Sequence, residues 1–168
     1  MQHLQNSGIT LASVHEVGEG ENLGSVRVQL PWEDQPRQQW LAVASPMTGA
    51  DSGWFVMPVK GDEVLVAFDQ QDHDHGYVIG FLWNKQHKPP SDDTRQRIFR
   101  SKNGHCIRFI DSPEQNGDKG SIVIEDANHN TIVMCNTHIT ITHQAGVDIV
   151  APRVTILGRP VRQVGPPI

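Results

Sequence analysis

The sequence predicts an all-β protein in which a small closed barrel is followed by a stack of short strands. Val, Ile and Thr outnumber Leu and Ala by more than two to one, a bias that favours strands over helices. The 15 glycines and 11 prolines fall between short apolar runs, where they favour turns. No long stretch has the periodicity of an amphipathic helix, so we expect helix only as a short piece in a connection.

The first half of the chain contains five runs that are rich in β-branched or aromatic residues, each bounded by Gly, Pro, Asn or Asp. Ser25 to Leu30 alternates apolar and polar residues, which predicts a strand with one wet face. Val64 to Phe68 is continuously apolar and must be covered on both faces. Five strands in so short a segment predict a closed barrel. The runs are Ile9 to Val14, Gly24 to Leu30, Gln39 to Ala44, Glu63 to Phe68 and Tyr77 to Trp83.

The second half has a different composition. All Trp, Tyr and Phe residues lie between Trp32 and Phe109, and the segment Lys88 to Asp93, with two prolines and small polar residues, has the composition of a linker. We therefore expect a barrel domain over residues 1–88, a linker or collar over 89–103, a strand stack over 104–158 and a tail over 159–168.

The predicted stack consists of short strands at a nearly fixed spacing, over residues 121–125, 131–135, 138–142, 147–150 and 154–157. Most of them alternate one apolar with one polar face, and no helix or bulky side chain in the segment is available to cover the apolar face. Other copies of the same chain would cover this apolar face without any additional protein, which predicts an intertwined homo-oligomeric β-helix. The register of 131–135 is ambiguous. The expected core residues are Ile122, Ile124, Ile139, Ile141, Val147, Ile149, Val154 and Ile156.

Four blocks of the first half closely resemble the OB-fold signature of contractile-tail spike proteins, namely the phage baseplate assembly protein V family and the valine-glycine repeat (VgrG) proteins of type VI secretion. These blocks, in the family's order and spacing, are Gly24 to Trp32, Trp40 to Pro46, Gly61 to Phe68 and Gly76 to Asn84. Residues 95–157 resemble the family's trimeric β-helix needle. The resemblance implies a homotrimeric structural spike, with no enzymatic activity and no cofactor, that caps the tube or hub and pierces the target envelope.

Departures from the family pattern give expectations about partners. Few residues precede the first strand, where VgrG proteins carry a hub domain, so we expect a separate baseplate hub protein at the OB-fold end. The sequence has no histidine after His143, whereas self-closing spikes end in an iron-binding His-x-His motif. We therefore expect a separate tip protein of the proline-alanine-alanine-arginine (PAAR) repeat family; the alternative is that the tail alone covers the end. The expected docking residues are Val154, Ile156, Leu157, Gly158, Arg159, Pro160 and Val161.

Histidine-rich segments offer only weak metal candidates. Asp69 to His75 concentrates carboxylates with His73 and His75, but it lies between two predicted strands with no further fixed ligand, which favours a solvated hairpin loop. A second candidate is a ligand ring in which threefold symmetry brings together three copies of His129, His138 or His143. Their polar contexts favour outward-facing side chains, so no metal site is expected.

Single-stranded nucleic-acid binding is the alternative function, because OB-folds often bind single strands. A basic stretch supports it, with Phe99 and Phe109 interleaved between cations. Against it, the stretch leads out of the barrel and the net charge is −5, so we favour a solvated collar and no nucleic acid. The cations are Arg95, Arg97, Arg100, Lys102 and Arg108.

Further sequence features bear on chemistry and location. No Gly-x-Ser-x-Gly or His-Glu-x-x-His motif indicates an enzyme. Cys106 and Cys135 lie among β-branched residues, which predicts small buried side chains. With no secretory signal or long apolar run, we expect a cytosolic product. The family resemblance implies assembly in the bacterial cytoplasm and then a place in a phage tail or injection particle, in transient contact with the target outer membrane. The sequence leaves open whether that particle is a phage, a tailocin or a secretion system.

Overall fold

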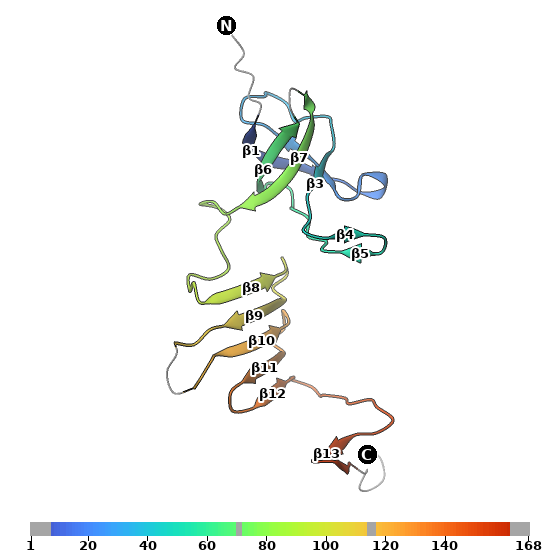
Figure 1. Ribbon diagram of the computed structural model, residues 1–168, viewed down its shortest axis with the longest axis vertical. Helices are drawn as coiled ribbons and strands as arrows, with labels where there is room; N and C mark the ends of the chain where they lie inside the picture. The colour runs from blue at the N-terminus through green and yellow to red at the C-terminus, as the bar shows by residue number, and fades with distance from the viewer. Residues whose placement is uncertain (1–7, 70–71, 114–116, 162–168) are drawn as a thin grey trace. The chain divides into compact units, whose positions relative to one another are not determined.

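The computed structural model describes residues 8–69, 72–113 and 117–161. By its internal contacts the chain divides into two compact units, Met1–Pro89 and Pro90–Ile168, which are described separately below (Figure 1). The regular structure of the described residues is all β apart from one 3-10 turn, η1 (Gly20–Asn22), in the connection after the first strand. No helix of these residues is long and apolar enough to span a membrane.

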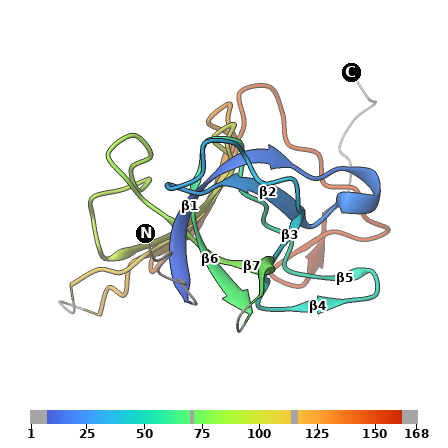
Figure 2. The same cartoon turned by 90° about the horizontal axis from the view of Figure 1, so that it is seen from above.

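The first unit is a closed five-stranded barrel in the order β1-β2-β3-β7-β6 (Figure 2). All of its pairings are antiparallel except that of β3 with β7. The barrel predicted from the sequence is thereby confirmed, with β1 and β7 longer than expected. The bounds are β1 (Ile9–Val17), β2 (Ser25–Gln29), β3 (Leu41–Val43), β6 (Glu63–Asp69) and β7 (Asp72–Leu82).

Valines that alternate along the strands fill the barrel. The buried members on β2 and β6 are Val26 and Val28, and Val64 and Val66, all fully inaccessible to solvent. Each such side chain contributes about 1.5–3 kcal/mol relative to an exposed one. The strict alternation of β2 is confirmed, because its intervening residues are half-buried on the outer face.

A small hairpin extends from the barrel between β3 and β6. It pairs β4 (Thr48–Gly49) with β5 (Ser52–Gly53), each too short to give a sequence signal. In Figure 2 the hairpin reaches outward on the side of the barrel opposite to β1. Its base is fixed by the amide of Trp54, which donates to the Met47 carbonyl over 2.9 Å.

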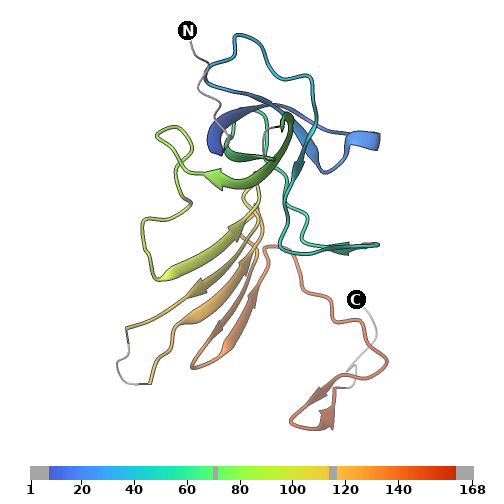
Figure 3. The same ribbon diagram turned by 45° about the horizontal axis from the view of Figure 1, so that its top comes forward.

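The second unit contains a five-stranded antiparallel sheet in the order β12-β11-β10-β9-β8 (Figure 3). Three of its strands are those predicted from the sequence. The other two were not expected, and β8 lies within the segment 89–103 that was assigned as a linker. The bounds are β8 (Gln96–Arg100), β9 (Cys106–Ile110), β10 (Ser121–Glu125), β11 (Thr131–Cys135) and β12 (Ile139–Thr142).

The two last predicted strands differ from expectation. Residues 147–150 have no strand partner in the single chain, so their alternating pattern is not expressed as a strand. Residues 154–157 do not form one strand of a stack either. Instead β13 (Thr155–Ile156) turns back onto β14 (Arg159–Pro160) in a hairpin, because Leu157 and Gly158 both adopt positive φ, at 51° and 75°.

Candidate functional site: an apolar face of the C-terminal sheet

The strand register gathers apolar side chains on one face of the β8–β12 sheet. Residues directly opposite each other in an antiparallel ladder share a face. One row across the sheet is Phe99, Ile107, Ile124, Ile132 and Ile141. A second row on the same face is Arg97, Phe109, Ile122, Met134 and Ile139. We call the nine apolar residues of these two rows the apolar face, and Arg97 lies beside them on the edge strand β8.

This face is left open to solvent in the single chain. The exposed fractions are 66% for Ile139, 55% for Phe99 and Ile141, and 48% for Phe109. Soluble monomers seldom expose a contiguous apolar surface of this kind, and such surfaces mark interaction sites. The arrangement therefore fits a surface that is covered in an assembly.

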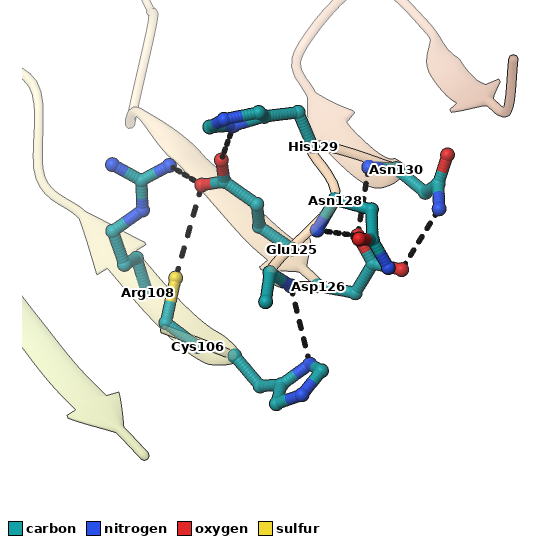
Figure 4. Close-up of polar contacts among 9 residues, drawn as sticks. Cys106, Arg108, Glu125, Asp126, Asn128, His129 and Asn130 are labelled. Atoms are coloured by element: carbon teal, nitrogen blue, oxygen red, sulfur yellow. Dashed lines mark hydrogen bonds and ion pairs between the residues drawn. The ribbon is translucent and has the colours of Figure 1, made fainter. Parts of the chain in front are cut away.

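The opposite face of the same sheet is mixed in polarity and is closed by its own side chains. Val123 and Cys106 are only 8% and 7% exposed. Arg108 reaches along this face and donates from Nη2 to Glu125 Oε2 over 2.6 Å, and Cys106 Sγ lies 3.8 Å from the same oxygen (Figure 4). Polar partners and small buried residues together leave this face without a comparable apolar surface.

The loop between β10 and β11 is organised by Asp126. Its Oδ1 accepts hydrogen bonds from the amides of Asn128 and Asn130 over 2.8 and 2.9 Å, and its Oδ2 accepts one from the Asn130 side chain over 2.8 Å (Figure 4). The Asn130 bonds are the main reason that the pKa of Asp126 falls to about 2. His129 holds a positive φ of 65° at the turn.

Glu125 links this loop to the closed face. His129 Nδ1 lies 3.1 Å from Glu125 Oε1, on the side of the carboxylate away from Arg108 (Figure 4). The hydrogen bond to His129, followed by the charge of Arg108, lowers the pKa of Glu125. An ionised Glu125 thus joins β9, β10 and the loop at physiological pH.

The structure brings together half of the core residues expected from the sequence. Ile122, Ile124, Ile139 and Ile141 lie on the apolar face, and the register places Ile132 and Met134 with them, which resolves the ambiguous strand. The other four, Val147, Ile149, Val154 and Ile156, lie outside the sheet. Sequence reasoning missed Phe99, Ile107 and Phe109, although the alternation of Ile107 and Phe109 with Arg108 was a usable signal.

The expected docking residues lie on the β13–β14 hairpin. Leu157 is 97% exposed at its turn, and Ile156 is 65% exposed beside it. The amide of Val161 donates to the Val154 carbonyl over 2.8 Å, which closes the hairpin. The part of the expected tail over 162–168 lies outside the described residues.

Several cations of the basic stretch are paired with carboxylates. Arg95 contacts Asp93 over 3.0 Å, and Arg97 lies 3.8 Å from Asp111. Hydrogen bonds from Arg95, chiefly from its side chain, lower the pKa of the Asp93 carboxyl to about 2. This pairing reduces the charge offered to a phosphate backbone, and nothing here favours the nucleic-acid alternative.

The histidine side chains that the structure describes do not come together around a common point. His75 lies exposed on β7, and the side chain of His73 is outside the described residues. His138 Nδ1 contacts the Thr137 hydroxyl, and His143 Nδ1 accepts the amides of Ala145 and Gly146. Within the described residues no group of three or more His, Cys, Asp or Glu is placed to hold a metal ion.

Two family models match consecutive parts of the chain. Residues 10–83 match the type VI secretion system/phage-baseplate injector OB domain. Residues 96–159 match the phage baseplate V C-terminal trimerisation domain. The first match covers all five barrel strands, and the second covers the β8–β12 sheet and most of the β13–β14 hairpin.

Individual relatives are type VI secretion system spike proteins. VgrG4b of Pseudomonas aeruginosa is 36% identical over 90 residues, which is 48% of this chain and 11% of that protein. VgrG2a of the same species is 35% identical over 72 residues, 40% of this chain and 9% of the relative. VgrG3 of Vibrio cholerae is 21% identical over 139 residues, 72% of this chain and 14% of the relative. The chain thus matches only about a tenth of the length of these proteins.

Proposed function

The chain belongs to the family of type VI secretion and phage-baseplate injector proteins, with the OB domain followed by the baseplate V trimerisation domain, and from this premise we propose that it is the structural central spike of a contractile injection machine. The observation that carries the proposal is the open apolar face within the segment that matches the trimerisation domain. A face of this kind needs cover, and two further copies of the same chain supply it.

Three copies of the sheet, each turned with its apolar face toward a common axis, form the body of the needle. Burial of apolar surface contributes about 25 cal/mol per Å², and each apolar residue of the two rows adds to this term in all three chains. The closed face, with Arg108 and Glu125, then points outward to water. A spike built in this way resists bending because each sheet is continuously hydrogen-bonded along the needle.

Residues 143–153 complete the needle through pairing between chains. In this segment Val147 and Ile149 flank Asp148, and the two apolar side chains are 52% and 70% exposed in the single chain. Corresponding segments of the other two copies provide the missing ladder partners and bury the apolar positions. The chains are intertwined at this level, so none leaves the trimer without breaking the pairing of the other two.

The β13–β14 hairpin is the proposed seat of a PAAR-type tip protein. Its turn presents Leu157 almost fully exposed, three times in the trimer. Apolar side chains held on a closed hairpin form a defined docking surface. A baseplate hub protein on the OB domain and transient contact of the tip with the target outer membrane complete the proposed set of partners.

The proposed work of the spike is mechanical. It is assembled in the bacterial cytoplasm, caps the tube and crosses the target envelope when the machine contracts, and no catalytic step is assigned to these residues. Chemical cross-linking of the purified chain tests the assembly. The expected ladder on a denaturing gel ends at three chains, and a ladder that stays at one chain or runs beyond three contradicts the proposal.

A further inference from the structure

The barrel unit has an open apolar hollow between the β4–β5 hairpin and the segment that leads into β2. Its volume is about 570 Å³, which lies within the usual range of binding pockets, roughly 300–1,000 Å³. Leu23, Met47 and Phe55 are 64%, 58% and 68% exposed there. We call it the hairpin hollow. Its apolar lining residues include Leu23, Val43, Met47, Trp54, Phe55 and Met57.

The hairpin hollow is held in shape by hydrogen bonds at its base. The amide of Trp54 donates to the Met47 carbonyl over 2.9 Å, and Ser45 Oγ donates to the Trp54 carbonyl over 2.6 Å. The amide of Val43 donates to the Gly24 carbonyl over 2.9 Å, which ties the segment before β2 to β3. A preformed hollow loses little binding energy to ordering, which favours a specific partner.

Carboxylates border the hairpin hollow on both of its walls. On one wall Glu19 precedes η1 and Glu21 lies within it, both exposed, and this turn leads directly into Leu23. On the other wall Asp51 lines the hollow from the turn between β4 and β5. Figure 2 shows η1 and this hairpin on the same side of the barrel. We call Glu19, Glu21 and Asp51 the acidic rim.

The segments that form the hollow contain no cation. Residues 18–26 and 43–59 include no Lys or Arg. The first cations beyond them are Arg27 and Lys60, and Arg27 is paired with Glu16 on the outer face of β2 over 2.9 Å. Among the residues that the structure describes, no ion pair involves a member of the acidic rim. The hollow therefore combines an apolar floor with a negative potential.

This combination selects one class of partner. Like charge disfavours nucleic-acid phosphates and anionic lipid headgroups beside three carboxylates. A protein segment with an apolar side chain between Lys or Arg residues fits both features, because the apolar side chain enters the floor while the cations meet the carboxylates on the two walls. The exposed rings of Trp54 and Phe55 also attract cations through their faces.

We propose that the hairpin hollow docks a segment of another protein in which an apolar side chain lies between Lys or Arg residues. The apolar side chain packs on Met47 and Phe55, and the flanking cations pair with Glu21 on one wall and Asp51 on the other. This inference goes beyond the proposed spike, because it assigns a recognition chemistry to the barrel unit and does not depend on the oligomeric state. No residue of the β13–β14 hairpin takes part, so the site is separate from the proposed seat of the tip protein.

Peptide binding to the full chain tests the inference. The probes are three short synthetic peptides that share a Leu-Phe centre and carry Lys, Gln or Glu on both sides, each labelled with a dye for fluorescence anisotropy. We expect the lysine peptide to bind, and the glutamine peptide to bind roughly tenfold more weakly because it lacks the exposed ion pairs. The glutamate peptide should not bind. The affinity of the lysine peptide should fall as the salt concentration rises.

Matched variants locate the binding site. Glu19→Gln, Glu21→Gln and Asp51→Asn together remove the charges of the acidic rim, and asparagine tolerates the positive φ of 53° at position 51. This rim variant is expected to bind the lysine peptide only as well as the natural chain binds the glutamine peptide. A control variant with the same net charge should bind the lysine peptide normally. It removes three exposed carboxylates elsewhere, through Asp34→Asn, Asp92→Asn and Asp148→Asn.

A further variant tests the apolar floor. Met47→Asn is expected to weaken the lysine and glutamine peptides alike. Equal affinity for the lysine and glutamate peptides, an equal loss in the rim and control variants, or unchanged binding to Met47→Asn overturns the proposal. Light scattering of the same samples reports the trimer separately. A trimeric mass without peptide binding therefore overturns the docking site and leaves the proposed spike intact, whereas a monomeric mass with peptide binding does the reverse.

Discussion

Asp126 shows how one side chain shapes the second unit. Its carboxylate accepts the amides of Asn128 and Asn130, so the turn between β10 and β11 is fixed from within. The short connection keeps β11 in register with β10, and this register places Ile132 on the apolar face. A local hydrogen-bond pattern thus determines which residues face the proposed trimer axis.

The lowered pKa of Asp126 predicts a pH-dependent contribution to stability. Its folded-state pKa is about 2 against an ordinary value of 3.8. The carboxylate therefore stabilises the fold above about pH 4, and this contribution is lost as the pH falls toward 2. Asp126→Asn keeps an acceptor oxygen but removes the charge. We expect the variant to have a lower urea midpoint than the natural chain near neutral pH, and the difference to shrink toward pH 2. A difference independent of pH would contradict this role.

Leu157 provides a second test at the residue scale. It holds a positive φ while 97% exposed, an unusual position for an apolar residue. Asparagine tolerates this conformation, so Leu157→Asn should preserve the hairpin and remove only the apolar contact. Loss of a buried leucine costs about 1.5–3 kcal/mol, so we expect at least a roughly tenfold weaker affinity for a purified PAAR-repeat protein. Met47→Asn, which removes an exposed apolar side chain of the barrel unit, is the control and should bind normally.

The proposed assembly depends on the β8–β12 sheet. Its two faces differ in the way that a needle requires, since one is apolar and open while the other is closed by the Arg108–Glu125 pair. Adjacent residues on one strand therefore face opposite environments. Thr140 shares its row with Val133 on the closed side, and Ile141 pairs with Ile132 on the apolar side.

A matched pair of variants on β12 tests this difference. Ile141→Asp places three carboxylates near the trimer axis, each costing several kcal/mol after relaxation, and is expected to prevent assembly. Thr140→Asp puts the same charge on the outward face and should be tolerated. Refolding yield and trimer fraction by gel filtration compare the two. Equal behaviour of the variants would show that the assigned faces are wrong.

The sequence predicts these elements only where the pattern and the partner both lie in the same chain. The barrel strands and β10 to β12 combine β-branched runs with clear turn residues, so they were predictable. Gln96 to Arg100 carries mostly polar and charged residues, and its strand character depends on pairing with β9. Residues 147–150 show the reverse case. Their alternation indicates which side chains share a face, but the described part of the single chain offers them no strand to pair with.

The residues of the apolar face could likewise be predicted from the sequence only in part. Alternation alone places Ile139 and Ile141 on one face. In Thr131 to Cys135 the three central residues are all apolar, so only the ladder with β10 and β12 decides which of them join that face. Phe99 lies on β8, within the segment 89–103 where the sequence predicts a linker or collar, and Ile107 lies on β9, which is not among the predicted strands.

At the scale of the whole molecule, the buried core is concentrated in the first unit. The barrel holds the fully inaccessible valines, whereas among the described residues of the second unit only Cys106 and Val123 are buried, at 7% and 8% exposure. A sheet with so little enclosed apolar volume obtains its stability from association. We therefore expect the second unit to fold only as the trimer assembles, so that dilution alone does not yield a well-folded monomer.

Absolute mass by light scattering of the purified chain tests directly whether the chain folds as a trimer. The account predicts a species of three times the 18.7 kDa chain mass at all accessible concentrations. A well-folded monomer at micromolar concentration, with the β8–β12 sheet intact by hydrogen exchange, would contradict it.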